Sequence, residues 1–212
     1  MAVPGNAERP LSRPRRRNVL SHQAILDATG QLLTEVGYGL TIEGVAARAG
    51  VGKATVYRWW PGKGALVIEA LSGALQRVPV EAATGDLRAD LLTAVRRAIE
   101  IFAFAPQNAV IPALAADLMG DPVLAQQFRD QLLRPRRSVV ASIVRAAVER
   151  GELPAELDIE LLLDLYAGTV FYRVVVSGEP VTDTLAEQLV DLLLDGKPPL
   201  KTARKGEEST SS

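Results

Sequence analysis

Residues 41–63 read TIEGVAARAGVGKATVYRWWPGK, and their spacing predicts two short helices joined by a tight turn. Thr41 is a favoured N-cap residue, and the apolar residues that follow it recur at helical spacing until Gly50 ends the first helix. A second helix is expected to open at Gly52 and to turn Val56 inward. The stretch therefore has one apolar face for a core and one polar face that is open to a partner.

The polar face of the second helix combines basic, aromatic and small residues. Its members are Lys53, Ala54, Thr55, Tyr57, Arg58 and Trp59. Two helices joined by a short turn that contains Gly form a helix-turn-helix, in which the second helix enters the major groove of DNA. Lys53 and Arg58 can donate hydrogen bonds to guanine, and Ala54 can contact a thymine methyl group. Donors that suit phosphate are the side chains of Thr41, Thr55, Tyr57 and Lys63.

This stretch resembles the amino-terminal signature of the TetR family of transcriptional regulators. The family's run is Thr-x-x-x-Ile/Val-Ala-x-x-Ala-Gly-Val-x-x-x-Thr-Val/Leu-Tyr-x-x-Phe/Trp-x-x-Lys. Every fixed position is met here, by Thr41, Val45, Ala46, Ala49, Gly50, Val51, Thr55, Val56, Tyr57, Trp60 and Lys63. The resemblance covers residues 20–67, and the rest of the chain is similar to the family's helical regulatory domain in length and helix pattern.

The resemblance implies an all-α protein with an N-terminal helix-turn-helix DNA-binding domain and a C-terminal helical domain for ligand binding and dimerisation. It also implies a ligand-responsive repressor that binds a palindromic operator in double-stranded DNA as a homodimer and is released by a small-molecule effector. A helix-turn-helix activator or an architectural DNA-binding protein without an effector is the alternative. The effector's identity, the operator sequence and the target genes stay open.

The resemblance also assigns roles within the helix-turn-helix. The family's base-reading positions fall at Gly52, Lys53, Ala54, Arg58 and Trp59, and Trp60 falls where the family has a core aromatic residue. Tyr57 is expected to bind phosphate, with packing as its alternative role, and Lys63 has the alternative of an ordinary surface lysine. For Arg48, phosphate contact and plain solvent exposure are equally good interpretations.

Composition excludes several other classes of protein. The chain has 212 residues, 48% of them hydrophobic, which is enough for a packed core. It contains no Cys and one His, His22, which is expected on the surface, so neither a metal site nor a cofactor nor an enzyme is expected. Its apolar runs are too short to span a membrane, and cytoplasmic residence is the default expectation.

Charge is distributed unevenly along the chain. Residues 1–64 carry 9 Lys and Arg against 4 Asp and Glu, whereas the remainder carries 15 against 21. A basic amino-terminal part favours a polyanion as partner for that part alone. Residues 1–20 are rich in Pro, Gly and Arg and are expected to form a disordered basic arm, which either contacts DNA or is simply solvated.

The domain organisation follows from periodicity and from Pro and Gly breaks. The DNA-binding domain is expected over 21–65, with a first helix from Ser21 to Gly37. The regulatory and dimerisation domain is expected over 66–197, with a fourth helix from Lys63 and a disordered tail over 198–212. Further helices are expected over residues 86–104, 109–119, 123–133, 136–150, 158–176 and 183–195, with a break at Pro135.

Two functional surfaces are expected in the second domain. Its last two helices carry apolar residues on more than one side, which favours a homodimer through these helices. An effector cavity could be lined by Phe102, Phe104, Met119, Phe128, Tyr166, Phe171 and Tyr172, although the same residues at helical spacing also suit a plain core. Arg134, Arg136 and Arg137 are interpreted as a solvated face.

Overall fold

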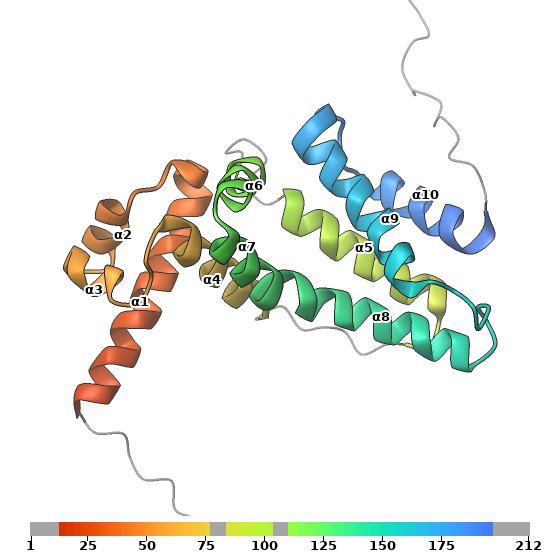
Figure 1. Ribbon diagram of the computed structural model, residues 1–212, viewed down its shortest axis with the longest axis horizontal. Coiled ribbons are helices and arrows are strands. Elements are labelled where there is room, and N and C mark those ends of the chain that lie inside the picture. The colour runs from red at the N-terminus through yellow and green to blue at the C-terminus, as the bar shows by residue number, and fades with distance from the viewer. Residues whose placement is uncertain (1–12, 77–83, 104–109, 197–212) are drawn as a thin grey trace, which may run out of the picture. The chain divides into compact units, whose positions relative to one another are not determined.

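The computed structural model describes residues 13–76, 84–103 and 110–196, which form helices joined by loops, with no strand among them. The all-α fold expected from the sequence is therefore confirmed. The helices divide into two compact units (Figure 1). Unit 1 is built from described residues within 1–79 and 105–135, and unit 2 from those within 80–104 and 136–212.

Unit 1 packs around α4 (Lys63–Gln76), which contacts α1 and α7. Its residues Leu66, Val67 and Ile68 are consecutive and fully buried. A helix that is apolar on all sides has to be covered on all sides, and here the other helices of the unit supply the cover. These are α1 (Arg13–Val36), the 3-10 turn η1 (Gly37–Gly39), α2 (Ile42–Arg48), α3 (Lys53–Tyr57), α6 (Val110–Gly120), α7 (Pro122–Phe128) and the π-helical segment η3 (Arg129–Leu133).

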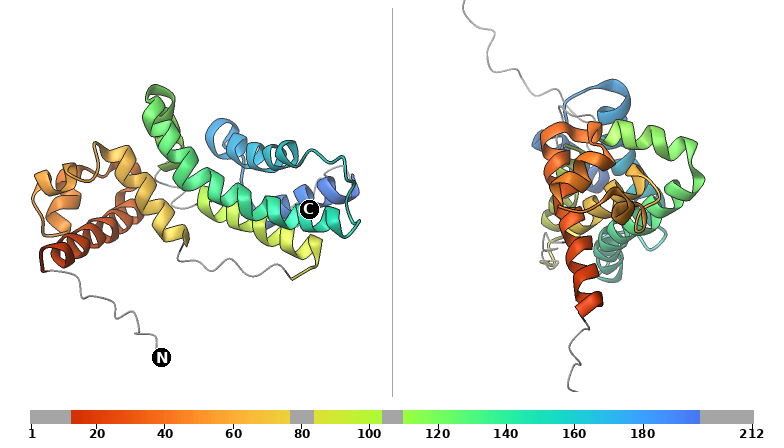
Figure 2. Two further views of the ribbon diagram at one scale, coloured as in Figure 1. Left: turned by 60° about the horizontal axis from the view of Figure 1, so that its bottom comes forward. Right: turned by 90° about the vertical axis from the view of Figure 1, so that its left-hand side faces the viewer.

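Unit 2 is a bundle whose helices run side by side (Figures 1 and 2). Its helices are α5 (Leu87–Ala103), α8 (Arg134–Glu149), α9 (Ile159–Tyr172), the π-helical segment η4 (Arg173–Ser177) and α10 (Asp183–Asp195). Each helix contributes to one core, in which Val95, Val144, Leu163, Val170 and Ala186 are at most 1% exposed. The unit therefore has a hydrophobic centre of its own, as an independent domain requires.

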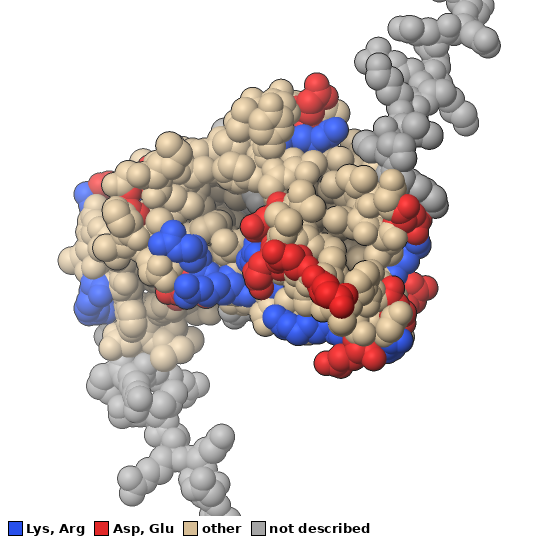
Figure 3. All heavy atoms as spheres, turned by 45° about the vertical axis from the view of Figure 1, so that its right-hand side comes forward, with Lys and Arg blue, Asp and Glu red and all other residues tan. Residues whose placement is uncertain are grey.

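Ion pairs run along the contact between α5 and α10. Four carboxylates, Asp183, Glu187, Asp191 and Asp195, follow one another at i, i+4 spacing on α10. Arg88 pairs with the last two of them, and Arg96 lies 3.4–3.5 Å from the first two. Acidic side chains gather over unit 2 on the face drawn in Figure 3, with basic ones beside them. Exposed pairs of this kind contribute little to stability, so the contact between the two helices rests mainly on their apolar residues.

The first helix starts earlier than the sequence indicated. The expected start was Ser21, but α1 begins at Arg13, so the disordered arm expected over residues 1–20 is wrong for 13–20. Arg favours helices, and a proline in the first turn, here Pro14, costs no hydrogen bond. Near Ser21 the helix packs against little, since Val19 is 55% and Leu20 64% exposed, so no apolar periodicity is required there. Residues 1–12 and the tail from 197 lie outside the described residues.

The break expected at Pro135 is also wrong, because the chain stays helical from Pro122 to Glu149. The π-helical segment before Pro135 explains this: the Arg134 amide bonds to the carbonyl of Arg129, five residues back. Such a wider turn accommodates a ring that would clash in a regular helix. The carbonyl of Gln131, four residues before the proline, accepts a hydrogen bond from the Ser72 hydroxyl instead (2.9 Å).

The packing divides the chain at a different place from the boundary expected after residue 65. Leu114, Leu124 and Leu132 are buried in the same core as the helix-turn-helix and α4. Unit 1 therefore contains α6, α7 and η3 as well as the first four helices. Apolar periodicity indicates which residues of a helix are buried, but it does not indicate which other helices cover them. The sequence pattern therefore could not predict that α6, α7 and η3 pack with the first four helices.

Candidate nucleic-acid interface

The first helix of the helix-turn-helix has both of its ends fixed by local hydrogen bonds. At its start, the Thr41 hydroxyl accepts from the Gly44 amide over 3.1 Å, which confirms Thr41 as the N-cap of α2. At its end, Gly50 has a φ of 67°, and the amide of Val51 donates to the Ala46 carbonyl over 3.0 Å. A residue with left-handed backbone conformation, followed by an amide that bonds back to a carbonyl of the last turn, ends a helix and turns the chain sharply. The tight turn expected between the two helices is confirmed at Gly50, and it positions α3.

The second helix, α3, separates a buried anchor from an exposed face. Val56 is fully buried, and Trp60, just beyond the helix, is 1% exposed. On the other side Tyr57 is 50% and Trp59 42% exposed, and Lys53 is exposed as well. Large aromatic and basic side chains in contact with water on a rigid helix are typical of a surface that binds a partner.

Carboxylates already neutralise two of the basic residues on this surface. Lys53 forms an ion pair with Glu43 of α2, and the hydrogen bond in that pair raises the pKa of the lysine ammonium group. The Arg48 guanidinium donates to Glu35 of α1 over 2.5 Å. A phosphate or a base that binds Lys53 or Arg48 has to compete with these partners or share them.

An aromatic cluster under α3 was missed by the sequence analysis. The indole N–H of Trp60 donates to one carboxylate oxygen of Glu69 over 2.8 Å, and Nε2 of His22 lies 3.0 Å from the other. The His22 ring stacks on Trp60 with 4.8 Å between ring centres, so His22 is not the plain surface residue expected. It precedes Ile25 by three positions and Thr29 by seven, a helical spacing that could have placed it on the inner face.

Lys63, at the start of α4, also has partners inside the protein. Its Nζ donates to the carbonyl of Tyr38 over 3.0 Å and lies 4.1 Å from the centre of the Tyr38 ring. The Tyr38 hydroxyl in turn donates to Asp117 of α6, and burial, followed by that bond, raises the pKa of Tyr38. Lys63 therefore links α4 to η1, whatever else it binds.

Comparison with known proteins identifies the family. Residues 25–70 match the family model described as "Bacterial regulatory proteins, tetR family", and residues 81–193 match "Tetracyclin repressor-like, C-terminal domain". The chain belongs to the TetR family. The two models together cover the helix-turn-helix and nearly all of the described helices that follow it.

Individual TetR-family relatives align along most of their length. A transcriptional regulator of Bacillus subtilis, YdeS, is 36% identical over 84% of this chain and 90% of its own. The DNA-binding transcriptional repressor TetR of Mycobacteroides abscessus is 31% identical over 81% and 90%. Among solved structures, the TetR-family regulator SCO0332 is 35% identical, with a TM-score of 0.73 over 84% of this chain and 99% of that one.

The candidate DNA-contact residues of this TetR-family chain lie on α2 or α3, directly beside the ends of these helices, or at the start of α4. Eight of the ten are exposed: Thr41, Arg48, Gly52, Lys53, Ala54, Tyr57, Arg58 and Trp59. Thr55 and Lys63 are half-buried. Arg58 also reaches toward Asn18 of α1, with 3.5 Å between donor and acceptor. Contact of these residues with DNA stays a prediction.

The residues expected to line an effector cavity have different surroundings. Met119 and Phe128 belong to unit 1, where Met119 is 89% exposed and Phe128 packs against the core. Tyr166 and Phe171 belong to unit 2, the first buried and the second 40% exposed. The side chain of Phe102 and residue Phe104 lie outside what the structure describes.

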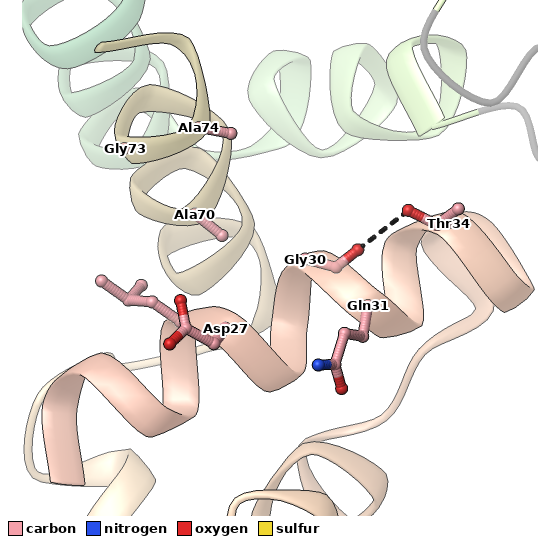
Figure 4. Close-up of a pocket in the computed structure, with 8 residues that line it drawn as sticks. Asp27, Gly30, Gln31, Thr34, Ala70, Gly73 and Ala74 are labelled. Atoms are coloured by element: carbon pink, nitrogen blue, oxygen red, sulfur yellow. Dashed lines mark hydrogen bonds between the residues drawn. The ribbon is translucent and has the colours of Figure 1, made fainter. Parts of the chain in front are cut away.

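A groove of about 460 Å³ opens between α1 and α4 within unit 1 (Figure 4). Apart from Leu26, the residues that line it are small or polar: Asp27, Gly30, Gln31, Thr34, Ala70, Gly73 and Ala74. None of the expected effector residues that the structure describes lines it. Among the described residues there is also no group of His, Cys, Asp and Glu that could hold a metal ion, and no helix with the length and apolarity to cross a membrane.

Proposed function

We propose that this TetR-family regulator is a repressor that binds a palindromic DNA operator as a homodimer and is released by a small-molecule effector. The observation that carries the proposal is the exposed surface of α3 and of the residues just after it, where Lys53, Tyr57 and Trp59 are open to solvent while Val56 anchors the helix in the core. A recognition helix has to be held rigidly while its outer side chains reach base edges and phosphates. The repressor role is supported by the Mycobacteroides abscessus relative, which is itself a repressor.

A stripe of exposed apolar residues on α9 supports the homodimer. Leu161 is 55%, Leu165 54% and Tyr172 57% exposed, and they share one face with Gly168, opposite the buried Tyr166 and Val170. Spacings of four, three and four residues keep these positions in line along a helix. An apolar stripe with small residues suits close packing against a second helix, and a two-fold dimer places the same stripe on both partners.

Selection from a pool of randomised double-stranded DNA tests the operator. The proposal predicts that the full chain enriches one sequence with two-fold symmetry, with half-site centres about 34–36 Å apart or a multiple of that distance. Enrichment of an asymmetric sequence, or of no sequence, would count against a dimeric repressor. Release by an effector is tested on the selected DNA, where a compound that binds the protein should lower its affinity for that DNA.

A further inference from the structure

Trp59 lies just beyond the recognition helix. The last residue of α3 is Tyr57, and the amides of Arg58 and Trp59 close a final turn on the carbonyls of Ala54 and Val56. Trp59 is 42% exposed. A large exposed side chain adopts several rotamers unless neighbouring groups exclude them. A group that restricts Trp59 comes from another helix, α1.

The ring of His22 on α1 contacts both neighbouring tryptophans. It meets the Trp59 ring edge to face, with 4.9 Å between ring centres and an angle of 73° between ring planes. Aromatic rings attract each other in this arrangement. The same imidazole stacks on Trp60, with 4.8 Å between ring centres and 27° between ring planes, and Trp60 is 1% exposed. His22 therefore connects the exposed indole of Trp59 to one that the core holds in place.

Glu69 on α4 holds the His22 ring in turn. One of its carboxylate oxygens lies 3.0 Å from Nε2 of His22, and the other accepts the hydrogen bond from the Trp60 indole over 2.8 Å. A carboxylate that engages two rings through separate oxygens keeps them in one mutual position. Ile68, the residue before Glu69, is fully buried, so Glu69 projects from a helix that is fixed in the centre of unit 1. A continuous set of contacts thus runs from α4 through His22 to Trp59.

A second residue of α1 reaches the other candidate DNA contact beyond α3. Asn18 precedes His22 by four positions, a spacing that places the two side chains on one face of the helix. Its side-chain oxygen lies 3.5 Å from the guanidinium of Arg58, and that guanidinium lies 6.0 Å from the centre of the Trp59 ring. One face of α1 therefore contacts both Arg58 and Trp59, although α1 is not part of the helix-turn-helix.

We propose that His22 is a positioning residue for DNA binding, which holds the Trp59 side chain in its binding orientation before DNA arrives. The inference rests on the proposed contact of Trp59 with DNA, and it extends the determinants of affinity to α1 and α4. A side chain that is already fixed loses little freedom on binding, so its contacts contribute more fully to affinity. His22 acts through its ring, and Glu69 keeps that ring in place.

Two variants of His22 separate its ring from its polar contact. His22→Gln removes the ring but keeps an N–H group near the position of Nε2, where it can still bond to Glu69. His22→Phe keeps a ring for both tryptophans but has no group that can bond to Glu69. The orientation of Trp59 and the affinity for DNA should follow the ring, so both should change in His22→Gln and stay near wild type in His22→Phe. A purely structural role of the contact with Glu69 predicts the reverse order.

Fluorine NMR measures the orientation of Trp59 without DNA. Trp59 and Trp60 are the only tryptophans of the chain, so protein grown with 5-fluorotryptophan gives two signals, which Trp59→Phe assigns. We expect the Trp59 signal to move toward that of free 5-fluorotryptophan in His22→Gln and to stay apart from it in His22→Phe. Gln23→Ala is the matched control, because Gln23 is exposed on α1 and bonds to Asp27 of the same helix (2.8 Å). An unmoved Trp59 signal in His22→Gln overturns the proposal.

Affinity for the selected operator measures the consequence for DNA binding. An aromatic pair stabilises one orientation by an amount that corresponds to a factor of about two to ten. His22→Gln should therefore weaken binding by about twofold to tenfold at each half-site, whereas His22→Phe and Gln23→Ala should bind like the wild type. Wild-type affinity in His22→Gln overturns the proposal, and so does a loss in His22→Phe that equals the loss in His22→Gln.

Removing Trp59 tests whether His22 acts through it. In a Trp59→Ala background the ring of His22 has nothing to position, so His22→Gln should cause no further loss of affinity. An equal loss with and without the Trp59 ring means that His22 acts by another route, and it overturns the proposal. The fluorine signals need no operator. If operator selection fails, they still decide whether His22 holds Trp59, so the two failures are distinguishable.

Discussion

The hydrogen bond from the Trp60 indole to Glu69 fastens the chain just beyond α3 to α4. Trp60→Phe keeps an aromatic ring in the core but removes the donor and leaves the carboxylate with His22 alone. Because a hydrogen bond to a charged group contributes about 1.5–3 kcal/mol, we expect the free energy of unfolding to fall by about that amount in urea titrations. Trp59→Phe is the matched control, since the Trp59 indole N–H has no partner among the described residues. An equal loss in both variants would contradict a special role for the Trp60 bond.

Asp90 predicts a pH dependence of stability in unit 2. It is 7% exposed, and its carboxylate accepts hydrogen bonds from the amide and hydroxyl of Thr84 (both 2.8 Å) and from the Gly85 amide (3.2 Å). Burial raises the pKa of Asp90, but these bonds outweigh it, and the pKa is lowered overall. A carboxyl whose pKa is lower in the folded state stabilises the fold above its unfolded pKa, about 3.9. That contribution is lost as the pH falls through the folded pKa.

Asp90→Asn tests this assignment. At pH 7 the free energy of unfolding should be lower than in the wild type by about 1–3 kcal/mol, because an amide accepts these bonds less well. The difference should shrink as the pH falls below about 4, where the wild-type carboxyl becomes protonated. Urea titrations at several pH values measure it, and a difference that stays constant down to pH 2 would contradict the assignment.

Single residues were the hardest feature to predict from the sequence. Trp60 was correctly expected in the core, because it occupies the core aromatic position of the family signature. His22 and Arg137 were both expected to be solvated because their side chains are polar, although helical spacing places each beside buried residues of its own helix. Their partners come from other helices, α4 for His22 and α9 for Arg137, and periodicity carries no information about such neighbours.

At the scale of elements, the Thr41 hydroxyl caps α2, and this structural role can be tested apart from any contact with DNA. Thr41 was expected to bind phosphate, yet its hydroxyl already accepts from the Gly44 amide. Thr41→Ala should lower the free energy of unfolding by about 0.5–2 kcal/mol, the usual cost of losing a cap, and Thr41→Ser should restore most of it. Thermal unfolding measures the effect. No loss in the alanine variant would mean that the cap contributes nothing to the stability of unit 1.

The bounds of a helix were predicted well where the helix buries an apolar face in a core, and less well elsewhere. The pattern gave α2 and α10 nearly to the residue, because their ends are marked by Thr41, Gly50 and Gly196. The second helix is shorter than expected, since α3 ends at Tyr57, before Arg58 and Trp59. The pattern also gave a wrong break at Pro135, because the π-helical segment that accommodates the proline depends on hydrogen bonds and not on residue type. The start of α1 was missed for a related reason: a helix that packs against little leaves no apolar pattern.

At the scale of the whole molecule, the apolar stripe on α9 predicts the oligomeric state. Leu165→Glu places a charge at the centre of the stripe, and burying that charge in an interface would be costly. We expect the wild type to sediment as a dimer and the variant as a monomer at micromolar concentration. Met119→Glu is the matched control, an equally exposed apolar residue of unit 1, and it should leave the dimer intact. A dimeric Leu165→Glu variant would place the interface elsewhere.

The most direct test of the central claim, that α3 reads DNA, is the effect of Lys53→Ala on base preference. Affinities of the wild type and the variant are measured on the selected operator and on operators changed at one base pair at a time. A charged contact to guanine discriminates by about 1–3 kcal/mol, so the variant should lose preference at one base pair in each half-site, at two-fold related positions, with little change in non-specific affinity. An unchanged preference at every position would contradict base reading by Lys53 and leave specificity to other contacts or to DNA shape.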